Sequence, residues 1–323
     1  MKNLTLRQIK IFQSAAKHLS FSRAAEELHV SAPAVSLQIK EMEADIGVNL
    51  FTRENRKVAL TSAGEYFLLY ARRVSSTLNE AATMMDQLRG TEFSTLKIGM
   101  VSTAQYFLPQ LLVQFKLECP HVQIRVEVRN RKQLVELLRE AEIDIAIMGR
   151  PPKEIETGLE PIAEHPHAFI ASTLNPLAGK AKLSPQVLNQ FELISRESGS
   201  GTRFIMEKYL AEHNISPIVS MEMSSNESIK QAVMSNLGIS FVSLHTIGWE
   251  IANHEIAILD IIGTPVMRTW HVVSLNKSST SHTALAFKSF MQKKGGGILN
   301  ALFAPAMQTL TAKTLATETT TTD

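Results

Sequence analysis

Small hydroxyl and basic side chains gather at the start of a predicted helix at residues 32–46. Ser31 can cap this helix, and Pro33 falls in its first turn, where a missing N–H costs nothing. Apolar residues recur along one face at steps of four, three and four: Val35, Ile39, Met42 and Ile46. The opposite face leaves Ser36 and Lys40 available to a partner. Such groups can donate hydrogen bonds to the phosphates and base edges of nucleic acid.

A shorter helix is predicted just before this one. Its apolar stripe also recurs at steps of three and four: Phe21, Ala24, Ala25 and Leu28. Ser20 can cap its start, and His29-Val30 provides a tight turn into the next helix. Two short helices joined by such a turn are typical of a DNA-reading helix-turn-helix.

A first helix and a hairpin wing complete the predicted DNA-binding domain, residues 1–60. The first helix has an apolar stripe that can close a three-helix core: Leu6, Ile9, Phe12, Ala16 and Leu19. Gly47 can end the third helix, and the segments 50–51 and 58–60 can pair as a hairpin. Residues 1–89 hold twelve Lys and Arg against nine Asp and Glu, and the whole chain 33 against 31. Net charge alone therefore does not indicate a nucleic-acid binder.

The predicted DNA contacts are exposed residues of the helix pair and the wing: Ser20, Ser22, Ser31, Ala32, Pro33, Ser36, Leu37, Gln38, Lys40, Arg53 and Arg56. Structural alternatives stay open for these residues. Ser31 can be only a helix cap, Ala32, Pro33 and Ser36 can be ordinary surface residues, and wing arginines can be solvated loop residues. Leu37 cannot hydrogen-bond a base, so it can offer only an apolar contact to a thymine methyl.

One long helix is predicted over residues 61–90. Its apolar residues recur at intervals of three and four, and no proline interrupts them: Phe67, Tyr70, Val74, Leu78, Ala81, Met85 and Leu88. A stripe of this length predicts dimerisation through a second helix. Packing on the chain's own next domain is the alternative. A dimer would present two recognition helices about one DNA turn apart, which predicts an inverted-repeat site on double-stranded DNA.

Past Gly90, predicted strands and helices alternate, which indicates a mainly parallel α/β sheet. The first series has strands at 96–101, 122–128 and 144–148 and helices at 107–115 and 134–138. The second has strands near 168–172, 192–195, 218–223 and 239–243, then a return through 269–275 and a last helix at 284–293. The return predicts an effector domain, 91–302, with 91–163 and 267–302 in one lobe and 164–266 in the other. The Thr-rich tail, 303–323, is predicted not to fold.

Polar residues that follow predicted strands are candidate ligand contacts, because ligands of open α/β sheets bind beyond the carboxyl ends of the strands. The candidates are Ser102, Thr103, Gln105, Gly149, Arg150, Ser200, Gly201, Thr202, Arg203, Asn226 and Glu227. Gly, Ser and Thr before a helix can cradle an anion with outward-pointing N–H groups. A small, phosphorylated anion is therefore the inferred effector. In the alternative, the Gly-Ser run is a flexible loop, Arg203 pairs with a carboxylate and Arg150 is hinge surface.

Four runs resemble the LysR-type transcriptional regulators: Ser20–Leu28, Ser31–Ile39, Leu50–Arg53 and Leu60–Gly64. The resemblance extends to about Leu302. It implies a winged helix-turn-helix, a linker helix and a two-lobed, periplasmic-binding-protein-like sensor. It also implies dimers or tetramers and RNA polymerase as a partner. Leu37 departs from the family, in which many members have a polar or basic residue there.

Three further runs resemble the branch of that family that controls the Calvin-cycle carbon-fixation operon: Ser102–Pro109, Ser200–Arg203 and Ser225–Val233. This implies an activator that responds to a phosphorylated metabolite or to NADPH. The residues do not choose among sugar bisphosphates, phosphoglycolate, phosphoenolpyruvate and NADPH. A LysR-type regulator of a different metabolic operon is the alternative.

Enzyme, metal and transport functions find little support. Cys119, the one cysteine, has no thiolate-stabilising neighbours, and His165-Pro166-His167 is the only close histidine pair, without cysteines beside it. Ser200 lacks the flanking glycines of a nucleophile elbow, so no cofactor or catalytic residue is expected. The N-terminus lacks an apolar signal core, which predicts a cytoplasmic protein. An enzyme or a stand-alone solute-binding protein is the remote alternative.

Overall fold

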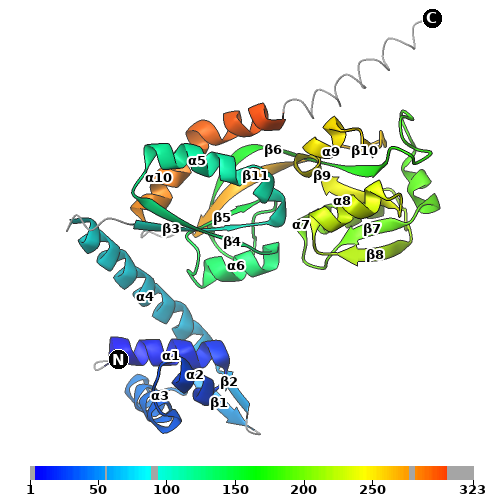
Figure 1. Ribbon diagram of the computed structural model, residues 1–323. Helices are drawn as coiled ribbons and strands as arrows, with labels where there is room; N and C mark the ends of the chain where they lie inside the picture. The colour runs from blue at the N-terminus through cyan, green and yellow to red at the C-terminus, as the bar shows by residue number, and fades with distance from the viewer. Residues whose placement is uncertain (1–3, 55–56, 89–93, 276–280, 304–323) are drawn as a thin grey trace, which may run out of the picture. The chain divides into compact units, whose positions relative to one another are not determined.

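The computed structural model describes residues 4–54, 57–88, 94–275 and 281–303, and the chain divides into two compact units (Figure 1). The N-terminal unit is Met1–Glu92, and the sensor unit is Phe93–Asp323. Arg56 in the wing and the predicted tail beyond Phe303 lie outside the described residues.

Three helices, a hairpin and the start of a long helix build the N-terminal unit: α1 (Leu6–His18), α2 (Phe21–Glu27), α3 (Ala32–Ile46), β1 (Phe51–Glu54), β2 (Lys57–Leu60) and α4 (Ser62–Leu88). Phe12 is fully buried at the centre, with its ring 5.4 Å from that of Phe51 and 4.9 Å from that of Phe67. The predicted stripes of α2 and α3 face this core, with Ala24, Ala25, Val35, Ile39 and Met42 buried. Hydrophobic periodicity therefore predicted the buried faces of these two helices correctly.

Two residues of the stripe predicted for the first helix lie outside this core. Leu6 is 51% exposed and Leu19 is 47% exposed. Leu6 stands in the first turn of α1, directly after the Thr5 cap. Leu19 is the C-cap, and its left-handed φ of 45° ends the helical direction on which the spacing argument depends. Ala15 is buried beside Phe12 and Ala16 instead.

The hairpin wing has the expected pairing, with Phe51 opposite Leu60 and Arg53 opposite Val58. Glu43 of α3 holds its base, because its carboxylate accepts hydrogen bonds from the Leu50 and Phe51 N–H groups at 2.8 and 3.0 Å. Gly64 lets α4 start close to this point. A Cβ on Gly64 would overlap the Leu50 carbonyl oxygen, so only glycine fits there.

Helix α4 has 27 residues, so it is about 40 Å long. Its first turns belong to the N-terminal unit: Ala71 is buried, and Ser75 Oγ donates to Gln13 Oε1 at 3.1 Å. Phe67 also packs here, edge-on to Phe12. The prediction that Phe67 lies on a dimerisation stripe is therefore not supported, because one helical face already contacts the domain core.

A nine-stranded sheet runs through the described part of the sensor unit, in the order β4-β3-β5-β11-β6-β9-β7-β8 with β10 beside β6. Its strands are β3 (Ser94–Met100), β4 (Val122–Val128), β5 (Ile145–Met148), β6 (Thr157–Ser172), β7 (Leu193–Arg196), β8 (Val219–Met223), β9 (Ile239–Ser243), β10 (Ile256–Ile258) and β11 (Val266–Leu275). Its helices are η1 (Ser102–Tyr106), α5 (Leu108–Glu118), α6 (Arg131–Arg139), η2 (Pro185–Gln190), α7 (Gly201–Glu212), α8 (Asn226–Met234), η3 (Leu244–Thr246), α9 (Gly248–Ala252), α10 (His282–Phe290) and a π-helical turn, η4 (Met291–Gly295). Helix continues over residues 296–303.

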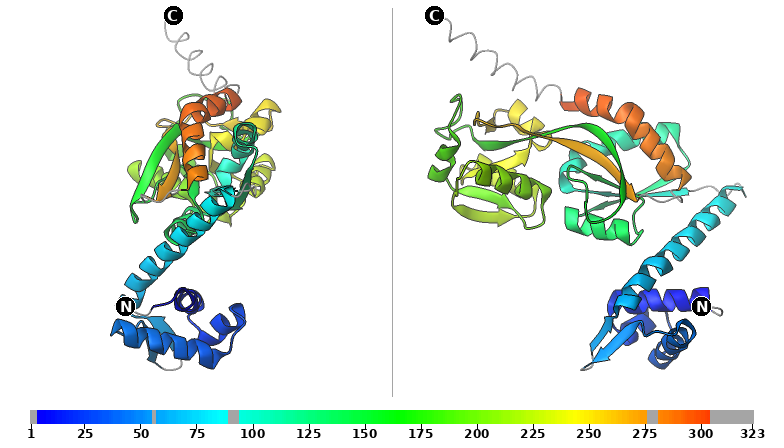
Figure 2. Two further views of the ribbon diagram at one scale, coloured as in Figure 1. Left: turned by 90° about the vertical axis from the view of Figure 1, so that its left-hand side faces the viewer. Right: turned by 180° about the vertical axis from the view of Figure 1, so that it is seen from behind.

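Two parallel groups of strands are joined by an antiparallel ribbon. Strands β3, β4 and β5 are parallel to one another, and so are β7, β8 and β9; we call these groups lobe I and lobe II. Strands β6 and β11 pair antiparallel over ten residues and run between the lobes, as the green and orange ribbons in Figure 2 show. The sheet is therefore mixed rather than mainly parallel, because the two crossovers pair with each other.

Each lobe has its own hydrophobic core. Phe107, Phe115 and Phe287 are buried in lobe I, whereas Phe169 and Phe241 are buried in lobe II. Separate cores are what the predicted two-lobed sensor requires.

Strand β6 is much longer than predicted. The sequence predicted a strand at 168–172, but β6 begins at Thr157 and contains Gly158, Pro161 and Pro166. Because proline lacks an N–H group, a proline in a sequence pattern argues against a strand. The β11 register shifts between Trp270 and His271, opposite Ala163 and Pro161, which accommodates this irregular segment. The short β10 was also missed.

Candidate DNA-binding surface and effector cavity

The predicted contacts of α2 and α3 lie on the surface of the N-terminal unit. Ser31 Oγ accepts a hydrogen bond from the Ala34 N–H at 3.4 Å, and Ser20 Oγ accepts one from the Arg23 N–H at 3.4 Å. Both serines are therefore helix caps. The remaining predicted contacts of the pair are exposed or partly exposed: Ser22, Ala32, Pro33, Ser36, Leu37, Gln38 and Lys40. The start of α3 thus presents small and polar groups, with Leu37 55% exposed among them.

Two predicted contacts need separate comment. Gln38 Nε2 donates to Glu41 Oε2 of the same helix at 2.8 Å, so a DNA base would have to compete with that bond. Arg53 lies in β1 of the wing, and Arg56 falls in the wing tip outside the described residues.

Beyond its first turns, α4 carries an exposed apolar stripe. Tyr70, Val74, Leu78, Ala81 and Met85 are all exposed, and they follow one another at steps of four, four, three and four. Tyr66, 71% exposed, extends the stripe by one turn and was not predicted. Leu88 is the last residue of the helix. An uncovered stripe of this kind is what a helix-to-helix dimer buries.

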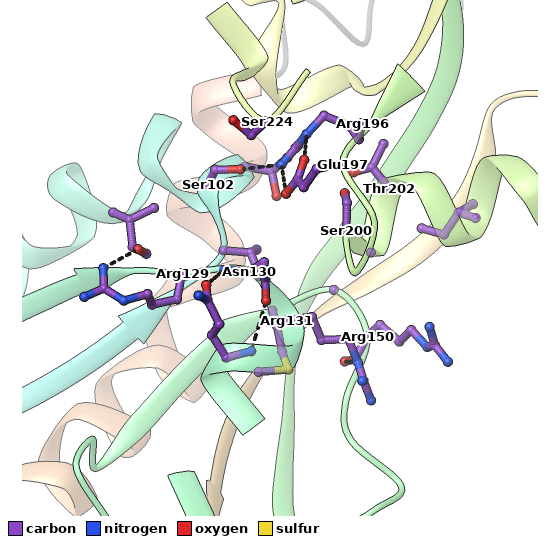
Figure 3. A pocket seen from close by; sticks show the side chains of 18 of the residues that line it. Ser102, Arg129, Asn130, Arg131, Arg150, Arg196, Glu197, Ser200, Thr202 and Ser224 are labelled. Atoms are coloured by element: carbon purple, nitrogen blue, oxygen red, sulfur yellow. Dashed lines mark hydrogen bonds and ion pairs between the residues drawn. The ribbon is translucent and has the colours of Figure 1, made fainter. Parts of the chain in front are cut away.

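A cavity of about 290 Å³ lies between the two lobes (Figure 3). Seven of the eleven predicted effector residues line it: Ser102, Thr103, Gly149, Arg150, Ser200, Gly201 and Thr202. They come from the ends of β3, β5 and β7, which the strand-end rule predicts. Gly149 is needed for space, because a Cβ there would collide with the His165 ring.

The other four predicted residues do not line the cavity. Arg203 instead pairs with Glu207 and Glu222, which is the alternative that the sequence left open. Gln105 is exposed. Asn226 and Glu227 bond other side chains of the sensor, as described below. Position after a strand was therefore not enough to identify them as lining residues.

Several lining residues were missed. Arg129, Asn130 and Arg131 follow β4, so the strand-end rule could have found them. Arg196 ends β7 and Glu197 follows it, just ahead of the predicted serine-glycine run. His165 and His167 lie in the part of β6 that was predicted poorly, so only the tertiary structure shows them at the cavity.

Arg196 connects the two lobes at one edge of the cavity. Its guanidinium is buried and binds both carboxylate oxygens of Glu197, at 2.7 and 3.0 Å. It also donates to Asn226 Oδ1 at 2.6 Å and, across the lobes, to Ser102 Oγ at 3.2 Å. Asn226 Nδ2 reaches the same hydroxyl at 3.3 Å. Figure 3 shows Ser102, Arg196 and Glu197 converging here.

Two further arginines at the cavity differ in whether a carboxylate binds and neutralises them. Arg131 binds Glu154 through two hydrogen bonds, at 3.1 and 3.0 Å, and these hold the pKa of Glu154 at about 2. Arg150 stacks on the Phe204 ring at 3.4 Å, and burial together with the nearby charge of Arg131 lowers its pKa. No ion pair of Arg150 occurs within the described ranges, so its charge is available to an anion.

The start of α7 has the form of an anion cradle. Ser200 is its N-cap, and within the described chain its hydroxyl makes no capping hydrogen bond. Gly199 before it has a φ of +86°, which favours glycine. The N–H groups of the first turn have no acceptor inside the helix, and the helix dipole favours a negative charge at this end.

A second polar network joins the lobes outside the cavity. Tyr106 of η1 donates to Glu227 of α8, and the buried Lys230 binds Glu227 at 2.9 Å and the buried Glu250 at 2.7 Å. Burial opposes the charged form of Lys230, but the bonds to Glu250 and Glu227 outweigh it and raise its pKa. Burial and the Glu227 bond raise the pKa of Tyr106 to about 12. Glu227 therefore holds the lobes together rather than lining the cavity.

A helix-turn-helix with an exposed recognition surface, followed by a two-lobed domain with an anion-suited cavity, defines a DNA-binding regulator controlled by a small molecule. Comparison with known families agrees. Residues 6–65 match the bacterial regulatory helix-turn-helix protein, lysR family, and residues 89–296 match the LysR substrate binding domain. The chain belongs to the LysR family of transcriptional regulators.

The chain is also similar to individual regulators and to a solved regulatory domain. The chain is 41% identical over 287 residues to the regulator CbbR of Rhodospirillum rubrum, covering 89% of this chain and 95% of the relative. It is 38% identical over 289 residues to the RuBisCO operon transcriptional regulator of Allochromatium vinosum, covering 90% and 96%. The regulatory domain of Synechocystis CcmR, solved in complex with 2-PG, is 35% identical with a TM-score of 0.60, covering 62% of this chain and 96% of that chain.

These matches confirm the predicted family, its fold class and the resemblance to the carbon-fixation branch. The protein is a transcriptional regulator that binds DNA and a small-molecule effector, and it is not an enzyme. Across the described residues, no helix is both long and apolar enough to cross a membrane.

Proposed function

We propose that this protein regulates carbon-fixation genes in the cytoplasm and that a small phosphorylated anion in the cavity between the lobes is its signal. The cavity carries the effector half of the proposal: hydroxyls of Ser102, Thr103 and Thr202, the start of α7, and Arg150, which forms no ion pair with a described residue, surround one space. The names of relatives support carbon-fixation genes as the target, since one of these relatives is a RuBisCO operon transcriptional regulator. CcmR bound to 2-PG supports a phosphorylated ligand.

DNA binding is proposed to use residues 1–60, with α3 in the major groove and the wing on the backbone or minor groove. The stripe Tyr70, Val74, Leu78, Ala81 and Met85 on the linker, 61–90, would pair with a second copy. The dimer would bind an inverted repeat, and pairs of dimers would engage RNA polymerase. An anion that favours one arrangement of the two lobes of 91–302 would change how dimers pair and how the DNA bends.

The test is fluorescence-anisotropy binding to the DNA upstream of the divergently transcribed neighbour gene, with and without 2-phosphoglycolate, phosphoenolpyruvate, ribulose bisphosphate and NADPH. Tight, salt-sensitive binding that one phosphorylated compound alters is the expected result. Binding that none of them alters would keep the regulator but favour a different metabolic operon. Absence of specific binding would contradict the proposal.

A pair of arginine variants separates the cavity from its surroundings. Arg150→Gln should weaken the effector response at least tenfold, because it removes a cavity cation that no described carboxylate binds, while DNA affinity without effector stays the same. Arg203→Gln is the matched control: Arg203 lies in the first turn of α7, next to the cradle, but it binds Glu207 and Glu222, so the response should persist.

DNA contacts are tested by comparing an operator with random DNA. Arg56→Ala should weaken binding to both and reduce the salt dependence, whereas Pro33→Ala and Ser36→Ala should weaken the operator more. Operator binding that all three variants leave unchanged would contradict the assignment.

A further inference from the structure

His167 is a fully buried histidine of β6 that lines the cavity. Its Nε2 atom is shielded from solvent and has no hydrogen-bond partner among the described residues. Leaving a buried polar atom without a hydrogen bond costs free energy, so a ligand group that forms this hydrogen bond would bind more tightly. Neither the strand-end rule nor the anion cradle accounts for this atom.

Hydrogen bonding determines which ring nitrogen of His167 carries the proton. Nδ1 lies 3.1 Å from the His165 carbonyl oxygen, which can only accept, so Nδ1 must donate. In a neutral ring, Nε2 is then a bare acceptor. His165 also lines the cavity, and its Nδ1 also lacks a partner among the described residues, but its other nitrogen differs: Nε2 meets the Ser243 hydroxyl at 2.9 Å, and a hydroxyl can donate or accept. The proton on His165 is therefore not determined by its partner.

The surroundings keep His167 neutral. Burial lowers its pKa to about 3, and although the bond to His165 opposes this, His245 and Arg268 add to it. The titratable groups that face it are His165 on the same strand, His245 on η3 and Arg268 on β11; the charges of His245 and Arg268 disfavour a positive charge on His167, whereas the hydrogen bond to the His165 carbonyl favours one. Phosphate and carboxylate oxygens cannot donate to a bare acceptor, so an anionic group gains nothing from this atom.

We propose that His167 Nε2 accepts a hydrogen bond from a hydroxyl of the effector, so that the preferred ligand is a phosphorylated compound that also carries a hydroxyl. This inference rests on the phosphorylated effector proposed above and specifies its second functional group. The phosphate would lie at the cradle of Ser200, Gly201 and Thr202, and the hydroxyl would face β6.

Two ligands that differ by one group test the proposal. Isothermal titration calorimetry of the full-length protein would compare 3-phosphoglycerate with 3-(phosphonooxy)propionate, which lacks only the hydroxyl. We expect the deoxy compound to bind roughly tenfold or more weakly, since a buried acceptor is left unpaired. Equal affinities would overturn the inference while the proposed function stands. If no phosphorylated compound binds, the proposed function fails and this inference falls with it.

Variants assign the preference to His167. His167→Phe should bring the two affinities together, and His167→Gln, which keeps an acceptor, should retain part of the preference. His245→Gln is the control, since His245 is also buried but accepts from Trp270 Nε1 at 2.9 Å and does not line the cavity. A preference that survives in His167→Phe would contradict the assignment. If His167→Phe does not fold, His167→Gln decides: a preference clearly smaller than that of the His245→Gln control supports the assignment, and a preference equal to that of the control overturns it.

Proton uptake gives an independent check. A neutral His167 predicts no uptake at this site between pH 6 and 8, measured as the dependence of binding enthalpy on the buffer, after correction with His167→Gln. A protonated ring that binds an anion would instead take up a proton and strengthen binding as the pH falls. Uptake that His167→Gln abolishes would overturn the proposal.

Discussion

The N-terminal unit and the sensor unit build their candidate binding sites in different ways. In the N-terminal unit, the predicted contacts of the helix pair lie within residues 20–40, and local caps at Ser20 and Ser31 hold them in place. The sensor cavity is lined by residues as far apart as Val101 and Ser224, from both lobes and the ribbon between them. A binding surface on a helix can be predicted once that helix is predicted correctly, whereas a cavity can be predicted only when the whole sheet is predicted correctly.

The sensor unit contains a buried ion pair as well as exposed ones, whereas the described ion pairs of the N-terminal unit are at least partly exposed. Glu27 links α1 to α2 through Ser14, Lys17 and His18 at a partly exposed site. Lys230 and Glu250 form a buried pair in the sensor. Exposed pairs contribute little to stability, whereas removal of one partner of a buried pair is costly. The sensor should therefore be the more sensitive unit to a lost charge.

The largest effect is expected from Phe12→Ala. The variant removes a fully buried ring that contacts Phe51 and Phe67, so the N-terminal unit should lose about 3–5 kcal/mol of stability. DNA binding should fail while the sensor still binds its effector, as urea unfolding and the two binding assays would show. Leu6→Ala on the same helix is the control and should change stability by less than about 0.5 kcal/mol, because Leu6 is exposed. Similar losses in both variants would contradict this division.

Lys230→Met should cost the sensor about 3 kcal/mol, because Glu250 stays buried without its cation. Urea unfolding followed by tryptophan fluorescence measures this. Lys208→Met is the matched control, since its pair with Glu212 is exposed, and it should cost under about 0.5 kcal/mol. Equal costs would show that burial of the pair does not matter here.

Ser31 variants separate capping from DNA contact. Ser31→Ala should lower the stability of the N-terminal unit by about 1 kcal/mol. Ser31→Asp keeps a capping oxygen, so stability should hold, but its charge should repel phosphates and weaken DNA binding about tenfold. Thermal unfolding and anisotropy give the two values. If Ser31→Asp binds DNA as the unmodified protein does, Ser31 is a cap alone.

The smallest expected effect is on the pH dependence of the stability of the N-terminal unit. Hydrogen bonds from Lys17, Ser14 and His18 lower the pKa of Glu27 from 4.5 to about 2, although slight burial opposes them. Because the folded-state pKa is lowered, the stabilisation is present above about pH 4.5 and is lost as the pH falls towards 2. Its size is modest, since the Glu27 side chain is 37% exposed. Circular dichroism between pH 6 and 2 should show a smaller acid loss in Glu27→Gln, and identical curves would contradict the assignment.

Strand-end reasoning worked where a strand was read correctly and failed where it was not. Thr103 and Thr202 line the cavity as predicted, because they follow strands whose apolar runs are plain. His167 was missed because β6 contains two prolines and a glycine, so its sequence is not typical of a strand. Arg203 was misassigned because a helix start fixes the direction of its backbone N–H groups but not of a long side chain.

Local sequence by itself determined the helix-turn-helix, its caps, the wing, the length of the linker helix and the family. Those features depend on periodicity, capping residues and turns, all of which act within a few residues. The tertiary structure alone decided that β6 and β11 pair, that Arg196 joins Ser102 across the lobes, and that His167 lines the cavity with a buried nitrogen that no described residue binds. Pairing between distant strands depends on how the whole sheet closes, and short-range patterns carry no record of that.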